Sequence, residues 1–538
     1  MNLVNFESFN TTYKKITKKD LIIFLIPFII FLCYLFIYNP GIVDVDPFNQ
    51  LHQISTNQFT NWHPFFHTFI EMQLLNIFPS TLTICIFQIV LFSTFWTAIC
   101  NYNRDENIPI NSKQFVLQII ITLIISLIPI NPILSISLHK DILFSYFLMF
   151  TCFLIKVLLD KKGNVSDSFF IVFSIVMAVT SQLRPNGIFV IITILLILSV
   201  YIYKNNDNKF DCVFLPALTI IFILLIASLN VAYDVEDTQK DAVFTKVSHM
   251  LADYDLNLEM NDADKQKLHE MISEEGILEN YKISFSDPIY NIADKNVYEN
   301  DKITYIKMAI YYSLKNPVHC IEYLLGSSPS VWDITRDSTW KGSVLNTYTD
   351  YTRDLYYQKA GLVPVGGYDN ASFVNSGTQL YKDTESFISF TKGNAVISTL
   401  FYSPALYMYL SLIIILVIHM LTNSREIYLV YLPNLLNILA VFFSMPAQDV
   451  RYLYPNFLVF NLLLIILLYT KFSLNANKIQ NNIAPIDMYQ DENNYTFEND
   501  AKFNKLETSF PKEKETPEEM EVRIRAKVLK ELEQEKKL

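Results

Sequence analysis

Charged residues are scarce in this chain of 538 residues: Asp, Glu, Lys and Arg make up only 18%, whereas soluble proteins usually carry about 25%. The shortage is uneven, because uncharged blocks of roughly membrane-spanning length alternate with polar stretches. This pattern excludes a single soluble domain and a disordered chain. The positive charge that nucleic-acid binding needs is missing as well, since the formal net charge is −11.

Cysteine is the next shortage, with six in the whole chain. Five of them lie in or beside the apolar blocks, and only Cys320 falls in the long polar segment 234–396. One cysteine in that segment excludes an intrachain disulfide there. Glycine is also scarce, at 11 residues, while Ile, Asn, Lys, Tyr and Phe are abundant, a bias that suggests an AT-rich bacterial genome.

In place of these residues the chain has ten apolar blocks of a length suited to crossing a bilayer. A crossing takes about 20 apolar residues, with about 17 tolerable, and the backbone must satisfy its own hydrogen bonds there. We therefore expect an all-α polytopic membrane protein with about ten transmembrane helices. The predicted spans are 21–38, 81–100, 114–130, 141–159, 167–183, 187–203, 212–233, 397–421, 427–445 and 452–470.

Lysine and arginine near the ends of these blocks predict the orientation. The lysines between positions 14 and 19 precede the first block and favour a cytoplasmic N-terminus. Counted onward, the basic loops all fall on the same side, which also places the C-terminus in the cytoplasm and the protein in the cell membrane. The expected parts are an N-terminus 1–20, a transmembrane module 21–233 with a first exterior loop 39–80, an exterior domain 234–396, C-terminal transmembrane helices 397–471 and a cytoplasmic tail 472–538.

The expected exterior domain is acidic, with 15 basic and 25 acidic side chains, and we expect it to be mainly α. Residues 303–325 predict one amphipathic helix that ends near Gly326. Trp332 and Trp340 suit contact with carbohydrate or lipid headgroups, but an ordinary small core explains them equally well. In the tail, a capping-box pattern at 516–519 predicts a terminal, solvated helix.

Two carboxylates, Asp44 and Asp46, follow the first block closely. Such a pair at a membrane surface suits a general base with an electrostatic or metal partner. Asp46 also precedes a proline, a pattern typical of the N-cap of a short helix, whereas Asp44 has no such structural explanation. Residue chemistry leaves capping and catalysis equally open for Asp46.

The motif Trp62-His63-Pro64 opens a second candidate region, at the start of a helix predicted over 65–78. His63, His67 and Glu71 have i, i+4, i+8 spacing, which permits metal ligation. The proline favours a capping role for His63 instead, and an interfacial helix with aromatic anchors is the preferred interpretation. His67 and Glu71 are then structural. No metal ligand is assigned, and a divalent cation stays open as a cofactor.

Three cations stand at predicted exterior ends of spans, where the positive-inside bias disfavours them. They are Lys140, which precedes Asp141, Arg184, which opens the turn Arg184-Pro185-Asn186-Gly187, and Arg451. Cations near helix ends often only extend to the lipid headgroups. A lipid-linked phosphate would give all three a common role, because Arg and Lys both bind phosphate oxygens.

These residues resemble the GT-C class of integral-membrane glycosyltransferases, which includes protein O-mannosyltransferases and aminoarabinose transferases, and more closely a group of bacterial polytopic proteins near that class. The resemblance covers 20–233 well and 397–470 loosely. An Asp-Val-Asp motif replaces Asp-Glu, and a second proline after His63-Pro64 is missing, which leaves the acceptor class open. The residues that carry the resemblance are Asp44, Asp46 and Gln50, Trp62-His63-Pro64, Lys140-Asp141, Arg184-Pro185-Asn186-Gly187 and Arg451-Tyr452.

The resemblance implies a polyprenyl-phosphate-linked sugar as donor and an acceptor at the outer membrane face, which would be a glycan, lipid or protein of the cell envelope. It makes Asp46 the base, Asp44 its assistant, and the three cations the stabilisers of the departing phosphate. Two alternatives stay open: a transporter or flippase for a lipid-linked glycan, and a non-catalytic membrane scaffold. The remaining substrate-binding candidates are Gln50, Trp62, His63, Asp141 and Asn186.

Overall fold

The computed structural model of this chain describes residues 16–43, 45–104, 109–110, 112–237, 242–335 and 375–482. Within these ranges the chain is mostly helical, and its β contacts are two isolated bridges, Ile42 with Ser137 and Thr60 with Glu236. Residues 1–477 form one compact unit and residues 478–538 a second. Asp44, Trp340 and the helix predicted after residue 516 lie outside the described residues.

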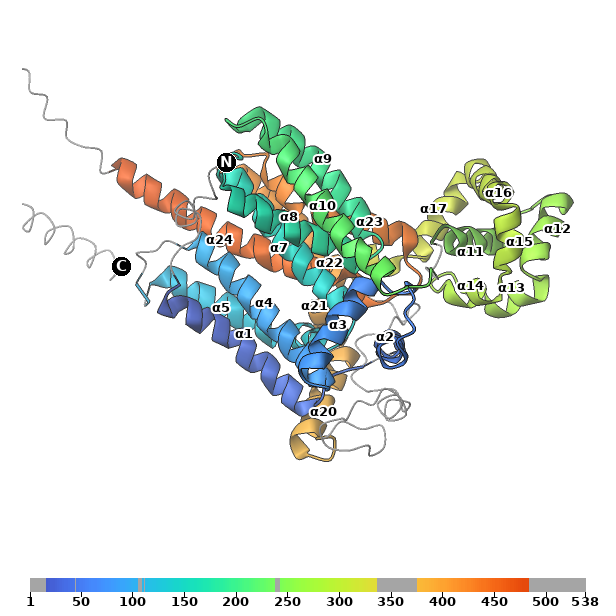
Figure 1. The fold of residues 1–538 in the computed structure, drawn as a ribbon, viewed down its shortest axis with the longest axis horizontal. Helices are drawn as coiled ribbons and strands as arrows, with labels where there is room; N and C mark the ends of the chain where they lie inside the picture. Colours follow the sequence, from blue (N-terminus) through green and yellow to red (C-terminus); the bar gives the residue numbers. More distant parts are fainter. Residues whose placement is uncertain are drawn as a thin grey trace, which may run out of the picture. The chain divides into compact units, whose positions relative to one another are not determined.

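Eight helices in the described part of the chain are long and apolar enough to cross a membrane (Figure 1). Two more apolar helices coincide with predicted spans but are shorter, with 15 residues in α5 (Lys113–Leu127) and 17 in α8 (Asp167–Leu183). The eight are α1 (Lys18–Ile37), α4 (Thr81–Asn103), α7 (Lys140–Asp160), α9 (Gly187–Asn205), α10 (Asp211–Ala232), α22 (Pro404–Thr422), α23 (Ile427–Ser444) and the segment Val450–Phe472, which joins the 3-10 helix η2 (Val450–Leu453) to α24 (Tyr454–Asn482).

The prediction of one continuous helix over 397–421 is wrong. The chain forms α21 (Ala395–Tyr402) and then α22, with Ser403 between them in an extended conformation. The cause is Pro404, which lacks an N–H and disfavours a helical conformation in the residue before it. α20 (Gln379–Gly393) precedes this break.

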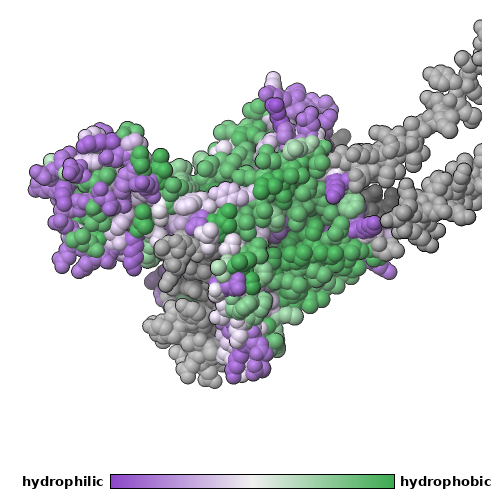
Figure 2. All heavy atoms as spheres, turned by 180° about the vertical axis from the view of Figure 1, so that it is seen from behind, coloured by the Kyte–Doolittle hydropathy of each residue, from purple (hydrophilic) through white to green (hydrophobic). Residues whose placement is uncertain are grey.

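Burial differs strongly among the long helices and identifies α7 as their centre. In its most apolar stretch, 83% of the residues of α7 are buried, compared with 11% in α10. α7 packs against α4, α8, α23 and η2. On the face that Figure 2 shows, hydrophobic residues (green) cover most of the surface of the long helices. That surface suits contact with lipid, since a soluble protein rarely exposes so large an apolar area.

Three shorter helices, α2 (Val45–Thr56), α3 (Phe65–Ile77) and α6 (Ile130–Ser135), lie at one end of the long helices. The Ile42–Ser137 bridge brings the chain before α2 next to the chain before α7. Gly41 makes this approach possible. Its φ of +121° is one that other residues rarely adopt, and a Cβ there would collide with the Cys85 sulfur.

Within the long polar segment, residues 242–335, which we call the insert domain, contain a small core separate from that of the long helices. The face of this domain seen in Figure 2 is largely hydrophilic, and its core is apolar and aromatic. The prediction of one helix over 303–325 is wrong, because Pro317 begins a new helix after Asn316. Its helices are α11 (Ala242–Asn257), α12 (Asp262–Met271), α13 (Glu274–Asn280), α14 (Asp287–Ile292), α15 (Lys295–Asn300), α16 (Lys302–Lys315), α17 (Pro317–Gly326) and α18 (Pro329–Trp332).

Candidate functional site

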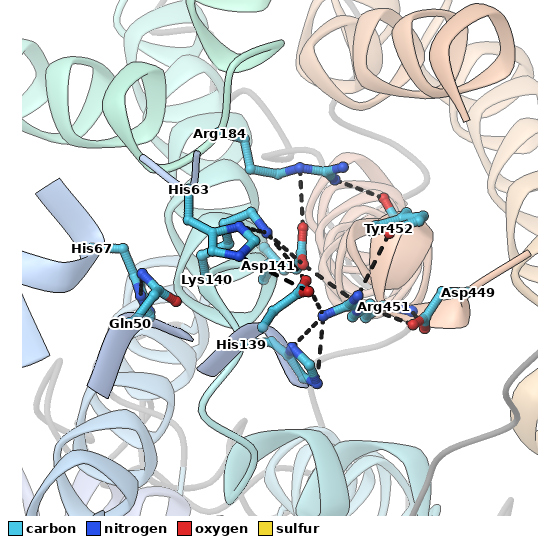
Figure 3. A network of polar contacts seen from close by, with 12 residues as sticks. Gln50, His63, His67, His139, Lys140, Asp141, Arg184, Asp449, Arg451 and Tyr452 are labelled. Atoms are coloured by element: carbon cyan, nitrogen blue, oxygen red, sulfur yellow. Dashed lines mark hydrogen bonds and ion pairs between the residues drawn. The ribbon is translucent and has the colours of Figure 1, made fainter. Parts of the chain in front are cut away.

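Charged side chains from five separate segments meet beside the first turn of α7 (Figure 3). The segments are the start of α2, the residues before α3, the start of α7, the end of α8 and η2. Three cations and three carboxyl groups come together there with two histidines. We call this group the charged cluster; its members are Asp46, His63, His139, Lys140, Asp141, Arg184, Asp449 and Arg451.

Local structure explains how two of these segments present their side chains. His139 is the N-cap of α7, so Lys140 and Asp141 fall in its first turn, where the helix dipole favours a carboxylate. Asp449 is the N-cap of η2, and its Oδ1 accepts a hydrogen bond of 3.0 Å from the backbone N–H of Arg451. The same carboxylate also pairs with the Arg451 side chain, at 2.8 Å from Oδ2 to Nε. Asp449 therefore directs the Arg451 side chain into the cluster.

Asp46 is held by two cations. Its Oδ2 lies 2.9 Å from Arg451 Nη1 and 3.6 Å from Lys140 Nζ. Its Oδ1 lies 3.9 Å from His63 Nε2, and the other nitrogen of that ring, Nδ1, lies 3.4 Å from Lys140 Nζ. Two segments that lie 405 positions apart in the chain (451 minus 46) thus meet at the Asp46 carboxylate.

Asp141 forms the second centre of the cluster. Its Oδ1 lies 3.0 Å from Arg184 Nε, and its Oδ2 lies 3.9 Å from Arg451 Nε and 4.0 Å from Lys140 Nζ. Arg184 also donates a hydrogen bond of 3.1 Å to the backbone carbonyl of Tyr452, and its guanidinium lies over that ring at 5.2 Å. Asp141 therefore contacts all three cations of the cluster and holds them close together.

The two carboxylates differ in access. The Asp46 side chain is 28% exposed, whereas that of Asp141 is completely buried. A partly open cavity of about 250 Å³ adjoins the cluster at Arg184, at the meeting point of the first turn of α3 with the ends of α8 and α10. Asp46 is thus the carboxylate that an incoming molecule can reach, and Asp141 serves to organise the cations. The cavity is lined by Asn61, Pro64, Phe65, Phe66, Ser181, Gln182, Arg184, Pro185, Ile188, Ile226 and Asn230.

Electrostatics set the protonation of the groups outside the long helices. Burial by itself would raise the pKa of the Asp46 carboxyl, but the charges of Arg451 and Lys140 outweigh burial and hold this pKa well below its usual range. Burial and the charge of Lys140 lower the pKa of His63 to about 4. Burial and Arg451 lower the pKa of His139 well below its usual value. At neutral pH, Asp46 is therefore ionised and both histidines are neutral.

Six of the ten predicted site residues belong to the cluster, and three of the others contact different neighbours. Gln50 is buried between α2 and α3, where its Nε2 donates to Thr68 Oγ1 at 2.9 Å. Trp62 is 39% exposed, and its ring lies 6.1 Å from that of Tyr290 in the insert domain. Asn186 donates from Nδ2 to Asn437 Oδ1 on α23, at 3.0 Å. Asp44 lies outside the described residues.

The structure shows neither the capping role predicted for His63 nor the capping alternative left open for Asp46. α2 begins at Val45, so Asp46 lies inside its first turn and is not the residue before it. α3 has Pro64 at its N-cap position, so His63 lies one residue further back and turns toward Asp46 and Lys140. For both side chains, contacts with distant parts of the chain replace the local hydrogen bonds that the sequence pattern favoured.

His139 and Asp449 complete the cluster, although neither was among the predicted site residues. His139 contacts Arg451 Nη1 through Nδ1. Each adjoins a predicted member, at one position before Lys140 and two before Arg451, and this adjacency is the signal that could have identified them. Their roles depend on which way each side chain turns, which spacing alone does not determine.

His67 and Glu71 form a second buried polar group on α3. His67 is 1% and Glu71 0% exposed, and His67 Nδ1 lies 3.8 Å from Glu71 Oε2 and 3.0 Å from Gln50 Nε2. His63 does not join them, because it lies outside α3 and faces Asp46. In the described part of the chain, no three His, Cys, Asp or Glu side chains are placed to hold a metal ion.

Comparison with protein-family models, with curated proteins and with solved structures finds no match for this chain.

Proposed function

We propose that this chain is a membrane glycosyltransferase of the GT-C type, which transfers a sugar from a polyprenyl-phosphate-linked donor to an acceptor at the outer face of the cell membrane. The observation that carries the proposal is the accessible carboxylate of Asp46, in contact with Lys140 and Arg451. Transfer from a sugar phosphate needs a base for the acceptor and cations for the departing phosphate, and this arrangement supplies both.

The proposal includes an orientation. With the N-terminus in the cytoplasm and ten crossings, in which α5 and α8 cross as short spans and α21 with α22 count as one, the charged cluster faces outward. The basic loops then lie inside, as the positive-inside rule favours. Shorter spans are tolerated where the bilayer thins locally or neighbouring helices shield their ends. The donor would reach the cluster from the outer leaflet.

In the proposed reaction, the acceptor hydroxyl oxygen attacks the anomeric carbon of the sugar, and Asp46 accepts the hydroxyl proton. The bond between that carbon and the phosphate oxygen breaks, and its electron pair stays on the phosphate. Negative charge on the leaving polyprenyl phosphate therefore grows during the step. Lys140, Arg184 and Arg451 would stabilise this charge, and they are 11–12% exposed, so water screens them little.

The low pKa of Asp46 is consistent with this sequence of events. With Arg451 and Lys140 beside it, the carboxylate is a weak base in the empty protein. A bound phosphate would compete for the same two cations and raise the pKa of Asp46. Asp46 would thus become a stronger base only when the donor is bound, and it would stay deprotonated in the empty protein.

The position of the ionisable groups favours an enzyme over the transporter alternative. Lys140 and Asp141 are the first two residues of α7, and Arg451 is the second residue of the apolar segment Val450–Phe472. Transporters tend to place such groups near the middle of the bilayer. The cavity at Arg184 also lies at helix ends.

The proposal predicts that Asp46→Asn reduces transfer at least ~100-fold, because the amide cannot accept the proton. The measurement is the content of lipid-linked sugars and envelope glycans in cells that carry only the variant. Asp262→Asn is the matched control, since Asp262 is an exposed aspartate in the first turn of α12. It should leave transfer unchanged.

Three results would count against the proposal. Full transfer by folded Asp46→Asn protein would remove Asp46 as the base. Unchanged envelope glycans after deletion of the gene would remove the reaction altogether. Accumulation of a complete lipid-linked glycan on the cytoplasmic side would point to a flippase.

A further inference from the structure

An exposed apolar row runs along two consecutive helices of the insert domain. On α16 it comprises Ile303, Ile310 and Leu314, which are 68%, 53% and 77% exposed. On α17 it continues through Val318 and Ile321, which are 69% and 57% exposed. We call these five residues the apolar row. Within α16, Ile303, Ile310 and Leu314 are seven and four positions apart, and within α17, Val318 and Ile321 are three apart, so each helix carries its part of the row on one face.

The apolar row is not the face that builds the insert domain. α16 turns Tyr305, Met308 and Tyr312 into the interior, where they are at most 5% exposed. The core is thus complete without the apolar row. Large apolar side chains that stand together on a surface usually mark a contact with a partner or a membrane.

Charge distinguishes α16 from the rest of its domain. Residues 242–301 contain 13 acidic and 5 basic side chains, whereas residues 302–315 contain three lysines and no acidic residue. Lys307 and Lys315 are exposed on the same helix as the apolar row. A row of apolar side chains flanked by lysines suits a bilayer surface with anionic headgroups, where each lysine contributes about 1 kcal/mol.

The connection to the long helices gives the apolar row a place at such a surface. α17 leads directly into α18, which packs against α22 and α23. The Tyr409 hydroxyl of α22 donates a hydrogen bond of 3.2 Å to the carbonyl of Trp332, and Gln448 Nε2 donates one of 2.9 Å to the carbonyl of Ser327. α17 is therefore attached where the apolar surface of α22 begins, and exposed Trp332 is of the type enriched at membrane interfaces.

We infer that α16 and α17 lie on the bilayer surface, with the apolar row inserted among anionic lipids. This contact would fix the insert domain to the membrane that the long helices cross. The inference does not depend on the proposed reaction, because none of its residues belongs to the charged cluster.

The test uses full-length protein in vesicles of phosphatidylglycerol and phosphatidylcholine, with the native cysteines replaced and a nitroxide label at Leu314→Cys or Ile321→Cys. Exposed Glu275 on α13, as Glu275→Cys, is the control position in the same domain. Collision with oxygen, which concentrates in lipid, is compared with collision with a water-soluble nickel chelate. We expect the oxygen-to-nickel ratio to be several-fold higher at 314 and 321 than at 275.

The charge contribution has its own control. Lys307→Glu with Lys315→Glu should lower the ratio at 314 in anionic vesicles and much less in pure phosphatidylcholine. The control Lys295→Glu, at an exposed position on α15, should leave the oxygen-to-nickel ratio at 314 unchanged. Nickel access at 314 equal to that at 275 would place the apolar row in water, and shielding from both probes would indicate a protein cover or a second copy. Either result would overturn the inference, provided that the melting temperature of each labelled protein matches that of the unlabelled one.

Discussion

Two groups of buried charges lie at opposite ends of α1 and α4, and they are built differently. Near one end, Asp20 pairs with Arg104, and both side chains are 3% exposed. The Asp20 carboxylate also accepts hydrogen bonds from the Thr17 N–H and hydroxyl, and Arg104 donates one to Gln118. At the other end, in the charged cluster, Lys140 and Arg451 each contact more than one carboxylate.

The difference indicates which group is suited to bind a ligand. A cation that a buried carboxylate holds at close range gains little from a new anion, because this pair would have to break first. A cation that shares several carboxylates at distances up to 4.0 Å can exchange one of them for a phosphate oxygen with a smaller loss. The Asp20–Arg104 pair is therefore structural, and the charged cluster is the candidate for binding.

The largest expected effect is on the structural pair. Asp20→Asn removes a carboxylate that pairs with the buried Arg104 side chain, so unfolding should become easier by about 3–5 kcal/mol. Thermal unfolding in detergent measures this loss. The double variant Asp20→Asn with Arg104→Gln should regain much of it, because the buried cation is removed together with its carboxylate partner. Equal melting temperatures for wild type and the single variant would show that the pair is not buried in solution.

Arg451→Gln is expected to have the next largest effect, on transfer. It removes one phosphate-stabilising cation and a partner of Asp46, which should lower the rate about 100-fold to 1000-fold. The measurement is transfer per amount of folded protein, with Arg104→Gln as the matched control. Equal losses in the two variants would contradict the distinction between the two groups.

Glu71 adds a buried carboxyl outside both groups, and we expect it to make stability depend on pH. Burial raises the pKa of Glu71 well above its usual value, although the charge of Lys140 acts in the opposite direction. The folded protein therefore holds this proton more tightly than the unfolded chain. The resulting stabilisation is fully present below about pH 4.3 and is lost as the pH rises toward the folded-state pKa.

Glu71→Gln keeps the shape and removes the titration. We expect it to be more stable than wild type at neutral pH, with a difference that grows by at most about 1.4 kcal/mol per pH unit. Melting temperatures between about pH 5 and about pH 8 test this. The control Glu275→Gln, at an exposed position, should show the same dependence of melting temperature on pH as the wild type. The same dependence in Glu71→Gln would mean that the Glu71 carboxyl is solvated and would contradict the prediction.

The smallest expected effect concerns Asn186. Its hydrogen bond to Asn437 joins the start of α9 to α23, so Asn186→Ala should cost about 1 kcal/mol of stability and change transfer less than ~3-fold. Unfolding and transfer should be measured on the same preparation. A large loss of transfer at unchanged stability would restore the substrate-binding role that the sequence predicts for this residue.

Much of the helical layout could be predicted from the sequence, because a long apolar block has few structures other than a helix available in a membrane. Each of the ten predicted blocks is helical in the structure. The errors came at Pro317 and Pro404, where apolar periodicity continued across a proline. At both positions the local backbone restriction outweighed the pattern of side chains.

The charged cluster was predictable in part for a different reason. Cations are disfavoured at that side of the predicted spans, so Lys140, Arg184 and Arg451 stand out whatever the direction of their side chains. For Gln50, Trp62 and Asn186, the sequence offers only proximity to these motifs or the family resemblance. Their hydrogen bonds and ring contacts turn them to other neighbours, and only the three-dimensional packing determines that choice.

The burial of α7 has a consequence for motion in the charged cluster. Lys140 and Asp141 belong to the helix that is enclosed most completely, so any shift of theirs would disturb several neighbours at once. Asp46 belongs to α2, a helix of 12 residues that packs mainly against α3. The cluster thus has a stationary side and an adjustable side. In the proposed reaction, the donor would enter and leave through movement of the short helices, while Lys140 keeps its position on α7.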